Sequence, residues 1–148
     1  MAIKWREAMS IDGGFINDDH KFLISLINEF EDLLSEQFNQ SELIKSLEKL
    51  EYYTVYHFAR EESLQREIKW PDIEEHIEKH KKLVEYVKNA LALVKNIVTD
   101  DKVDRIQDNI LRLLKIWIIG HIMKHDIPMK FAARAHTVGR KYTPITSI

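Results

Sequence analysis

The sequence predicts an all-α protein built as a four-helix bundle. Only four glycines and three prolines interrupt 148 residues, so long stretches of helix-forming residues remain intact. Within these stretches apolar residues recur every three or four positions, the spacing that gathers them on one face of a helix. A chain of this length is one domain by default and can bury an ordinary core. We therefore expect a single domain over residues 1–148, with four helices, an N-terminal arm and a short C-terminal segment.

The first helix is expected at about residues 18–38, after the N-terminal arm. Asn17, Asp18 and Asp19 are of residue types that commonly cap a helix, and any of them can begin this one. An apolar stripe follows at helical spacing, and a histidine extends the stripe at its start. The first helix is therefore expected to turn one polar side chain, that of His20, towards the interior.

The second helix is expected at about residues 41–68 and has a regular seam of inward positions. Residues from Leu43 to Ile68 follow a 4,3,4,3 spacing, which is typical of a helix packed in a bundle. His57 and Glu61 occupy two of these positions, one helical turn apart. Because an unpaired charge is very costly in the interior, both side chains are expected to have a binding partner there.

The third and fourth helices are expected at about residues 72–98 and 102–126. His76 and His80 lie four residues apart on the apolar face of the third helix, so they point to the same side. His121 extends the apolar face of the fourth helix near its end. All four helices therefore bring at least one possible metal ligand to the interior, which is how bundles build buried metal centres.

These inward polar residues predict a single inorganic site. The chain has no cysteine, so imidazole and carboxylate are the available ligands, and they suit iron, zinc, copper, nickel or manganese. A lone histidine on an apolar face is more often a satisfied core residue, but this many buried imidazoles and carboxylates need cations as partners. Five imidazoles and two carboxylates suit two bridged ions. The predicted ligands are His20, His57, Glu61, His76, His80, His121 and Asp126.

Asp126 competes with His125 for the last ligand position. His125 follows His121 by four residues and would share its face in a regular helix. Asp126 follows by five residues and becomes reachable if the helix loosens before Pro128, which disfavours helical backbone at the preceding residue. A second carboxylate also offsets more of the charge of two ions, so we assign Asp126 and give His125 an outward polar role. His136 is expected to be exposed to solvent in the tail.

The overall charge excludes some partners. The formal net charge is −2 and the isoelectric point is about 6.4, so we expect no binding to nucleic acid or to anionic lipid. The first residues show no signal-peptide pattern, and no run of uncharged apolar residues is long enough to cross a membrane. The expected location is the cytoplasm.

Four segments occur in an order and spacing that resemble one family. They are Asp12-Gly13-Gly14-Phe15 with Asp19-His20-Lys21-Phe22-Leu23, the HFAREE segment at 57–62, Trp70-Pro71 before His76-Ile77-Glu78-Lys79-His80, and Trp117-Ile118-Ile119-Gly120-His121-Ile122 before Asp126. Over about residues 5–131 the chain resembles a bacterial hemerythrin. The resemblance implies an up-down-up-down bundle with two iron ions joined by an oxo or hydroxo group. Asp19 departs from the glutamine common in the family. Facing inward, it would add a negative charge beside a ligand-bearing residue and raise the local basicity, but we expect it to serve as a helix-start residue favoured by the helix dipole.

The resemblance also implies how the ligands are shared. Three histidines would bind one iron ion, two would bind the other, and Glu61 and Asp126 would bridge them. The set of three is His76, His80 and His121, and the set of two is His20 and His57. One position stays open at the second ion, and the family's chemistry makes dioxygen its ligand in a pocket that must stay dry. The side chains expected to line that pocket are Leu23, Phe58, Trp117, Ile122 and Met123.

The function expected from this site is reversible dioxygen binding for storage, transport or delivery, not enzymatic turnover. Di-iron oxidases of the ferritin type use more carboxylates and fewer histidines. The expected partners are dioxygen and a protein that receives the dioxygen or reduces the iron. The alternative is a di-iron peroxidase or oxidase, or a sensor of dioxygen or nitric oxide that acts through a separate partner.

Overall fold

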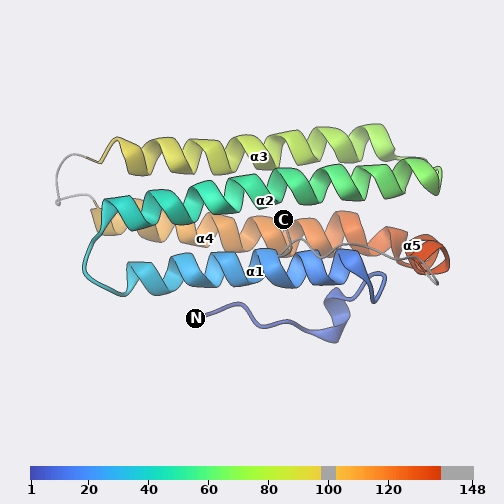
Figure 1. Ribbon diagram of the computed structural model, residues 1–148, viewed down its shortest axis with the longest axis horizontal. Coiled ribbons are helices and arrows are strands. Elements are labelled where there is room, and N and C mark those ends of the chain that lie inside the picture. Colours follow the sequence, from blue (N-terminus) through green and yellow to red (C-terminus); the bar gives the residue numbers. More distant parts are fainter. Residues whose placement is uncertain (98–102, 138–148) are drawn as a thin grey trace.

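The computed structural model describes residues 1–97 and 103–137 and shows a four-helix bundle, as predicted. Consecutive long helices run in opposite directions, and each packs against two of the others (Figure 1). No strand occurs in the described residues. None of the helices in this part of the chain is long and apolar enough to cross a membrane. The helices of the bundle are α1 (Phe15–Leu34), α2 (Gln40–Glu67), α3 (Ile73–Lys95) and α4 (Val103–His121).

Helix α1 begins and ends earlier than the sequence suggested. It begins at Phe15 because the Asp12 carboxylate accepts hydrogen bonds from three backbone N–H groups of the first turn, those of Gly14, Ile16 and Asn17 (2.8–3.1 Å). This side chain satisfies N–H groups that the helix itself leaves free. The helix ends at Leu34, and the acidic residues predicted to cap it lie inside it.

Helices α2 and α3 lie within a few residues of their predicted bounds. Asn39 caps α2 by accepting a hydrogen bond from the Glu42 N–H (3.2 Å). The helix stops where Lys69 adopts a left-handed conformation (φ 54°) and the Trp70 N–H donates to the Gln65 carbonyl (2.8 Å). Helix α3 ends at Lys95, and the predicted bounds at residues 98 and 102 lie outside the described residues.

The end of α4 departs from regular helix. A π-helical turn, η3 (Ile122–Asp126), follows it and leads into the short helix η4 (Ile127–Met129) and helix α5 (Lys130–Thr137). The His136 side chain is 32% exposed, in line with the expected exposure to solvent, although it lies on α5 and not in a loose tail. Its Nε2 lies 2.6 Å from Glu67 Oε2 on α2. The ion pair, together with a hydrogen bond from Arg134 Nε to the Ile11 carbonyl (2.9 Å), ties α5 to the bundle.

The N-terminal arm lies along α1 (Figure 1). The Ile3 N–H donates to the side-chain carbonyl of Asn28 (2.8 Å), and the Asn28 amide donates back to the Ile3 carbonyl (2.9 Å). Further along, the 3-10 helix η1 (Glu7–Met9) buries Met9 against the bundle. The predicted arm therefore packs against the bundle as a fixed part of the structure.

The core consists of two hydrophobic clusters with a polar layer between them. The larger cluster contains Leu23 and Trp117 and continues towards the α1–α2 loop. The smaller cluster contains Ile16, Leu64 and Met129 and lies at the α5 end. Along α1, α2 and α4, the predicted ligands fall between residues of the two clusters. The polar layer is thus covered by apolar side chains from both ends of the bundle.

Candidate metal centre

All seven predicted ligands meet in this polar layer, and each is at least 96% buried. Helix α1 supplies one residue, α2 and α3 supply a pair each, and the end of α4 with η3 supplies the remaining two. The pairs on α2 and α3 point inward together because residues four apart share a helix face. The donor atoms form two groups, in each of which all donor atoms lie within 4.8 Å of one another.

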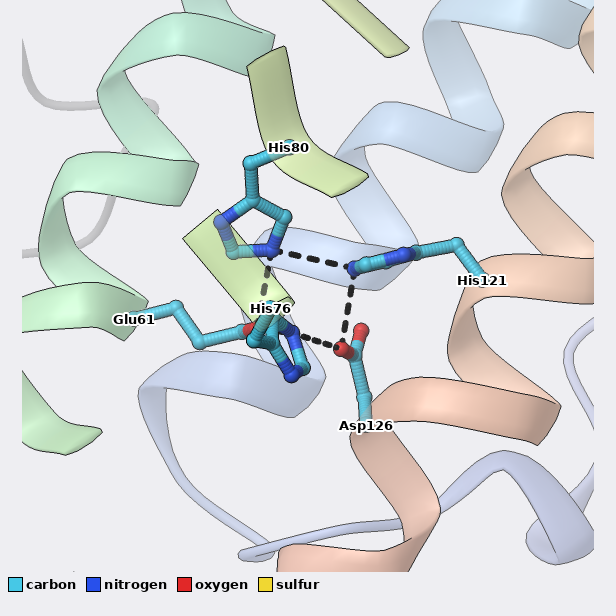
Figure 2. Close-up of side chains that lie close together, drawn as sticks. All are labelled: Glu61, His76, His80, His121 and Asp126. Atoms are coloured by element: carbon cyan, nitrogen blue, oxygen red, sulfur yellow. Dashed lines mark hydrogen bonds and ion pairs between the residues drawn. The ribbon is translucent and has the colours of Figure 1, made fainter. Parts of the chain in front are cut away.

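The larger group contains three imidazoles and both carboxylates (Figure 2). The Nε2 of His76 lies 2.9 Å from Glu61 Oε1 and 3.0 Å from Asp126 Oδ1. The Nε2 of His121 lies 3.0 Å from Asp126 Oδ1, and the Nε2 of His80 lies 3.3 Å from Glu61 Oε1. One oxygen of each carboxylate is thus directed to the three-histidine side.

The smaller group contains two imidazoles and the same two carboxylates. The Nε2 of His20 lies 3.0 Å from Asp126 Oδ2, and the Nε2 of His57 lies 3.2 Å from Glu61 Oε2. Each carboxylate therefore faces the three-histidine group with one oxygen and the two-histidine group with the other. This is the arrangement that two bridging carboxylates require.

The donor set fits metal cations. Among the described residues, neither oxygen of Glu61 or of Asp126 has a hydrogen-bond partner although all four are buried, and the same holds for the Nε2 atoms of His20, His57 and His76. The short N···O distances above lack the geometry of hydrogen bonds, so these polar atoms converge without being satisfied. Leaving such groups unpaired in the interior costs free energy, and a cation within reach of several of them would supply the partner.

The carboxylates and imidazoles of the centre shift one another's pKa values. Burial alone would lower the pKa of His57, but the adjacent carboxylates of Asp19 and Glu61 outweigh burial and raise it to about 10. In the same way, the neighbouring carboxylates raise the pKa of His76 to about 9. Burial favours the neutral form of Glu61, but the surrounding imidazoles hold its pKa well below the usual range. Without metal, protons on the imidazoles therefore balance the carboxylate charge.

The π-helical turn decides between Asp126 and His125. Its wider turn brings Asp126, five residues after His121, to the same side as that histidine. The ring of His125 is half-buried, 5.4 Å from the ring of His121 and 6.2 Å from that of His76, and belongs to neither donor group. Burial lowers the pKa of His125. The helix thus loosens before Pro128 as the sequence suggested, although His125 is less exposed than expected.

A second layer of residues supports two of the imidazoles from behind. The Nδ1 of His57 donates to Asp19 Oδ2 (2.9 Å), so the expectation that Asp19 merely starts the helix was wrong. Glu62 accepts a hydrogen bond from the Nδ1 of His80 (2.8 Å), a contact that the sequence analysis did not propose. The signal available for Glu62 was its place beside Glu61 in the HFAREE segment, on the side facing α3.

Four of the five predicted pocket residues are buried beside the centre. Leu23, Phe58, Trp117 and Ile122 belong to the larger hydrophobic cluster. The ring of Phe58 stacks on that of His80 with centroids 3.8 Å apart. Met123 is different, because 40% of its surface is exposed. This exposure speaks against the expectation that Met123 closes the pocket, and it fits a position two residues after the inward His121.

Comparison with known proteins identifies the family. The family model described as Hemerythrin HHE cation binding domain matches residues 14–128, which include all four long helices and all seven predicted ligands. The chain belongs to the hemerythrin family. The predicted resemblance is thereby confirmed. Hemerythrin domains of this type bind cations, in agreement with the donor groups described above.

Two relatives and one solved structure show how far this hemerythrin-like chain matches known members. It is 30% identical to Bacteriohemerythrin from Methylococcus capsulatus (strain ATCC 33009 / NCIMB 11132 / Bath) over 113 residues, which are 76% of this chain and 82% of that protein. It is 27% identical to a hemerythrin-like protein of Naegleria gruberi, covering 85% and 89% of the two chains. A wild-type hemerythrin crystal structure superposes with a TM-score of 0.76 at 25% identity, covering 90% of this chain and 99% of that one.

Proposed function

We propose that this hemerythrin-like protein binds dioxygen reversibly at a pair of iron ions and serves to store, transport or deliver it. One observation carries the proposal. The two donor groups share both carboxylates but differ by one imidazole, so one group offers five protein donor atoms and the other offers four. At equal coordination number, the second ion would keep one more position free for an external ligand.

The choice of iron rests on the donors and on the family. Imidazole and carboxylate suit iron among several divalent metals, and the cation-binding domain matched here is that of the hemerythrins. His76, His80 and His121 would hold one ion, His20 and His57 the other, and Glu61 and Asp126 would bridge them. Two ferrous ions bound here would supply the two electrons that dioxygen takes up on binding.

Binding is favoured over turnover by the ligand composition. Carboxylate-rich di-iron sites on other four-helix bundles place four glutamates around the metals, whereas this centre has five imidazoles and two carboxylates. Fewer anionic ligands stabilise highly oxidised iron less, so the bond within dioxygen is expected to stay intact. We therefore infer a binding protein. Its proposed partner is a protein that receives the dioxygen or reduces the iron, and its proposed location is the cytoplasm.

Reversibility requires that water stay out, and the chain provides side chains for this. Leu23 and Ile122 are fully buried beside His20 and His121, and Phe58 and Trp117 pack against each other with ring centroids 6.5 Å apart. In an apolar surrounding, bound dioxygen meets few proton donors that would release it as peroxide and leave oxidised iron behind.

Repeated exposure to dioxygen tests the proposal. The iron-loaded protein is reduced without air, mixed with dioxygen, and then returned to argon, while its visible absorbance is followed through several cycles. We expect a colour that appears with dioxygen and disappears under argon in each cycle, and no such colour in the zinc-loaded protein. Irreversible oxidation in the first cycle with release of peroxide would instead indicate an oxidase or a peroxidase.

A further inference from the structure

Asp19 is a fully buried carboxylate that does not belong to either donor group. It precedes His20 on α1 but is directed at α2, where its Oδ2 accepts a hydrogen bond from the Nδ1 of His57 (2.9 Å). Its other oxygen, Oδ1, accepts a hydrogen bond from Arg60 Nη1 (3.2 Å). Both carboxylate oxygens are therefore used, one on a predicted ligand and one on a cation.

Arg60 is held in place by more than this ion pair. Its guanidinium lies over the ring of Phe15, 4.8 Å from the centroid, and 5.9 Å from the ring centroid of Tyr56. Its side chain is only 17% exposed. A fixed cation next to a buried carboxylate lowers the cost of burying that charge, so the pair can keep Asp19 ionised beside His57.

The contact with Asp19 fixes which nitrogen of His57 is available to a metal. An ionised carboxylate only accepts hydrogen bonds, so the Nδ1 of His57 must carry the proton. When the ring gives up its other proton to bind a metal, the lone pair is therefore on Nε2, which lies 3.2 Å from Glu61 Oε2 on the side of the two-histidine group. A carboxylate behind a metal-bound imidazole orients the ring and makes it a stronger electron donor.

The two metal positions differ in the carboxylates that accept hydrogen bonds from the Nδ1 atoms of their histidines. On the three-histidine side, His80 donates from Nδ1 to Glu62 (2.8 Å), but Glu62 is 18% exposed and its charge is partly screened by water. The Nδ1 atoms of His20 and His121 have no hydrogen-bond partner among the described residues. The fully buried, ion-paired carboxylate thus stands behind the position that would keep a site free for dioxygen.

We propose that Asp19, held by Arg60, is a positioning residue that strengthens His57 as a ligand and favours the oxidised state of iron at the two-histidine position. The inference rests on the proposed di-iron function. The buried ion pair of Asp19 and Arg60 would thus influence the reduction potential of the iron, and with it how readily dioxygen takes up electrons from the two metal ions.

The test compares Asp19→Asn with Glu62→Gln and the wild-type protein, all iron-loaded. Redox titration without dioxygen gives the reduction potential, and metal analysis gives the iron content. We expect Asp19→Asn to keep two iron ions and to favour the ferrous state about tenfold, a rise of about 59 mV for a one-electron couple. Glu62→Gln should shift the potential less. Equal potentials for Asp19→Asn and wild type would overturn the inference.

A second variant keeps the test decisive if Asp19→Asn fails to fold or to bind iron. Arg60→Gln removes the cation that holds Asp19 and offsets the cost of its buried charge, so the potential should rise above that of the wild type, in the same direction as in Asp19→Asn. An unchanged or lower potential in Arg60→Gln contradicts the inference. The proposed function is judged separately, because its failure would appear in the wild-type protein as missing iron or irreversible oxidation.

Discussion

Glu61 is the residue on which most contacts of the centre converge. One of its oxygens faces His76 and His80, and the other faces His20 and His57. It sits one turn after His57 on α2, at a position the apolar spacing had assigned to the interior. A fully buried carboxylate among four imidazoles can serve as a shared metal ligand, and its charge balances the imidazoles when metal is absent.

Substitution Glu61→Gln keeps the shape of this side chain and removes its charge. We expect the purified protein to lose most of its iron, because a neutral amide cannot serve as an anionic bridge. The metal-free protein should lose about 3–5 kcal/mol of unfolding free energy, since charged imidazoles stay buried without their partner. Metal analysis and urea unfolding measure both effects.

The control for this variant is Glu78→Gln, which changes an exposed carboxylate that forms an ion pair with Lys81. It should keep its iron and its stability within about 0.5 kcal/mol. Full iron content in Glu61→Gln would contradict the bridging role.

Protonation of the metal-free centre gives a prediction for pH. The pKa of His57 is raised from 6.5 to about 10 and that of His76 from 6.5 to about 9. When folding raises the pKa of a histidine, the gain in stability is fully present at pH values below the pKa of the unfolded state. This gain is lost as the pH rises through the pKa of the folded state. Thermal unfolding of the metal-free protein should therefore occur about 5 °C or more lower at pH 10 than at pH 6.

The metal-loaded protein is the matched control for the pH series. Its imidazoles are neutral and bound to metal, so its unfolding temperature should change much less over the same range. A metal-free protein that is equally stable at both pH values, or more stable at pH 10, would show that these histidines are not protonated in the folded state.

At the scale of elements, the π-helical turn η3 is the feature that completes the centre. In a regular helix His125, four residues after His121, would share its face, and Asp126 would be rotated away. The wider turn reverses this choice and places Asp126 between the two donor groups. Pro128 cannot donate a backbone hydrogen bond to continue the helix, which fits the loosening at this point.

The neighbouring residues Asp126 and His125 allow a direct test of this register. Asp126→Ala should lose metal, because a carboxylate shared by both groups is removed. His125→Ala should keep two metal ions per chain, because its ring belongs to neither group. Metal analysis of the two variants distinguishes the registers, and the opposite pattern would indicate that the helix continues as regular α-helix in solution.

The same register predicts different roles for Ile122 and Met123. Ile122 is fully buried in the larger hydrophobic cluster, whereas Met123 is 40% exposed. Ile122→Ala should cost about 2–5 kcal/mol of stability and speed irreversible oxidation of the iron by admitting water. Met123→Ala should change stability by less than about 1 kcal/mol and leave the oxidation rate unchanged.

Absorbance decay of the dioxygen-bound protein gives the oxidation rates, and denaturant unfolding gives the stabilities. Faster oxidation in Met123→Ala than in Ile122→Ala would indicate that Met123 lines the pocket, and it would contradict the roles inferred from the exposure of the two side chains.

The inward residues of α2 and α3 could be predicted because their spacing is a local property of each helix. The contact between Asp19 and His57 could not, because it joins residues 38 positions apart and depends on how α1 is rotated against α2. The start of α1 was missed for a different, local reason, since the Asp12 side chain caps the helix from the preceding loop, ahead of the acidic residues expected to cap it. Local periodicity thus predicts which residues face inward, but not which second-layer groups they meet.

At the scale of the whole molecule, the centre joins all four helices in one polar layer between two hydrophobic clusters. The helix order and the all-α class followed from the sequence and are confirmed by the structure. A metal that binds the folded chain and not the unfolded chain stabilises the folded state by mass action. Loading with metal should therefore raise the free energy of unfolding of the whole bundle. The seven predicted ligands come together because each helix contributes its share at the same level along the bundle.

The ratio of iron to bound dioxygen in one reduced sample tests the central claim most directly. Iron is determined by metal analysis, and dioxygen uptake by a calibrated oxygen electrode. Two donor groups that differ by one imidazole predict two iron ions per chain and one dioxygen for each pair. A single iron ion per chain, or one dioxygen for every iron ion, would contradict a shared centre with one open position.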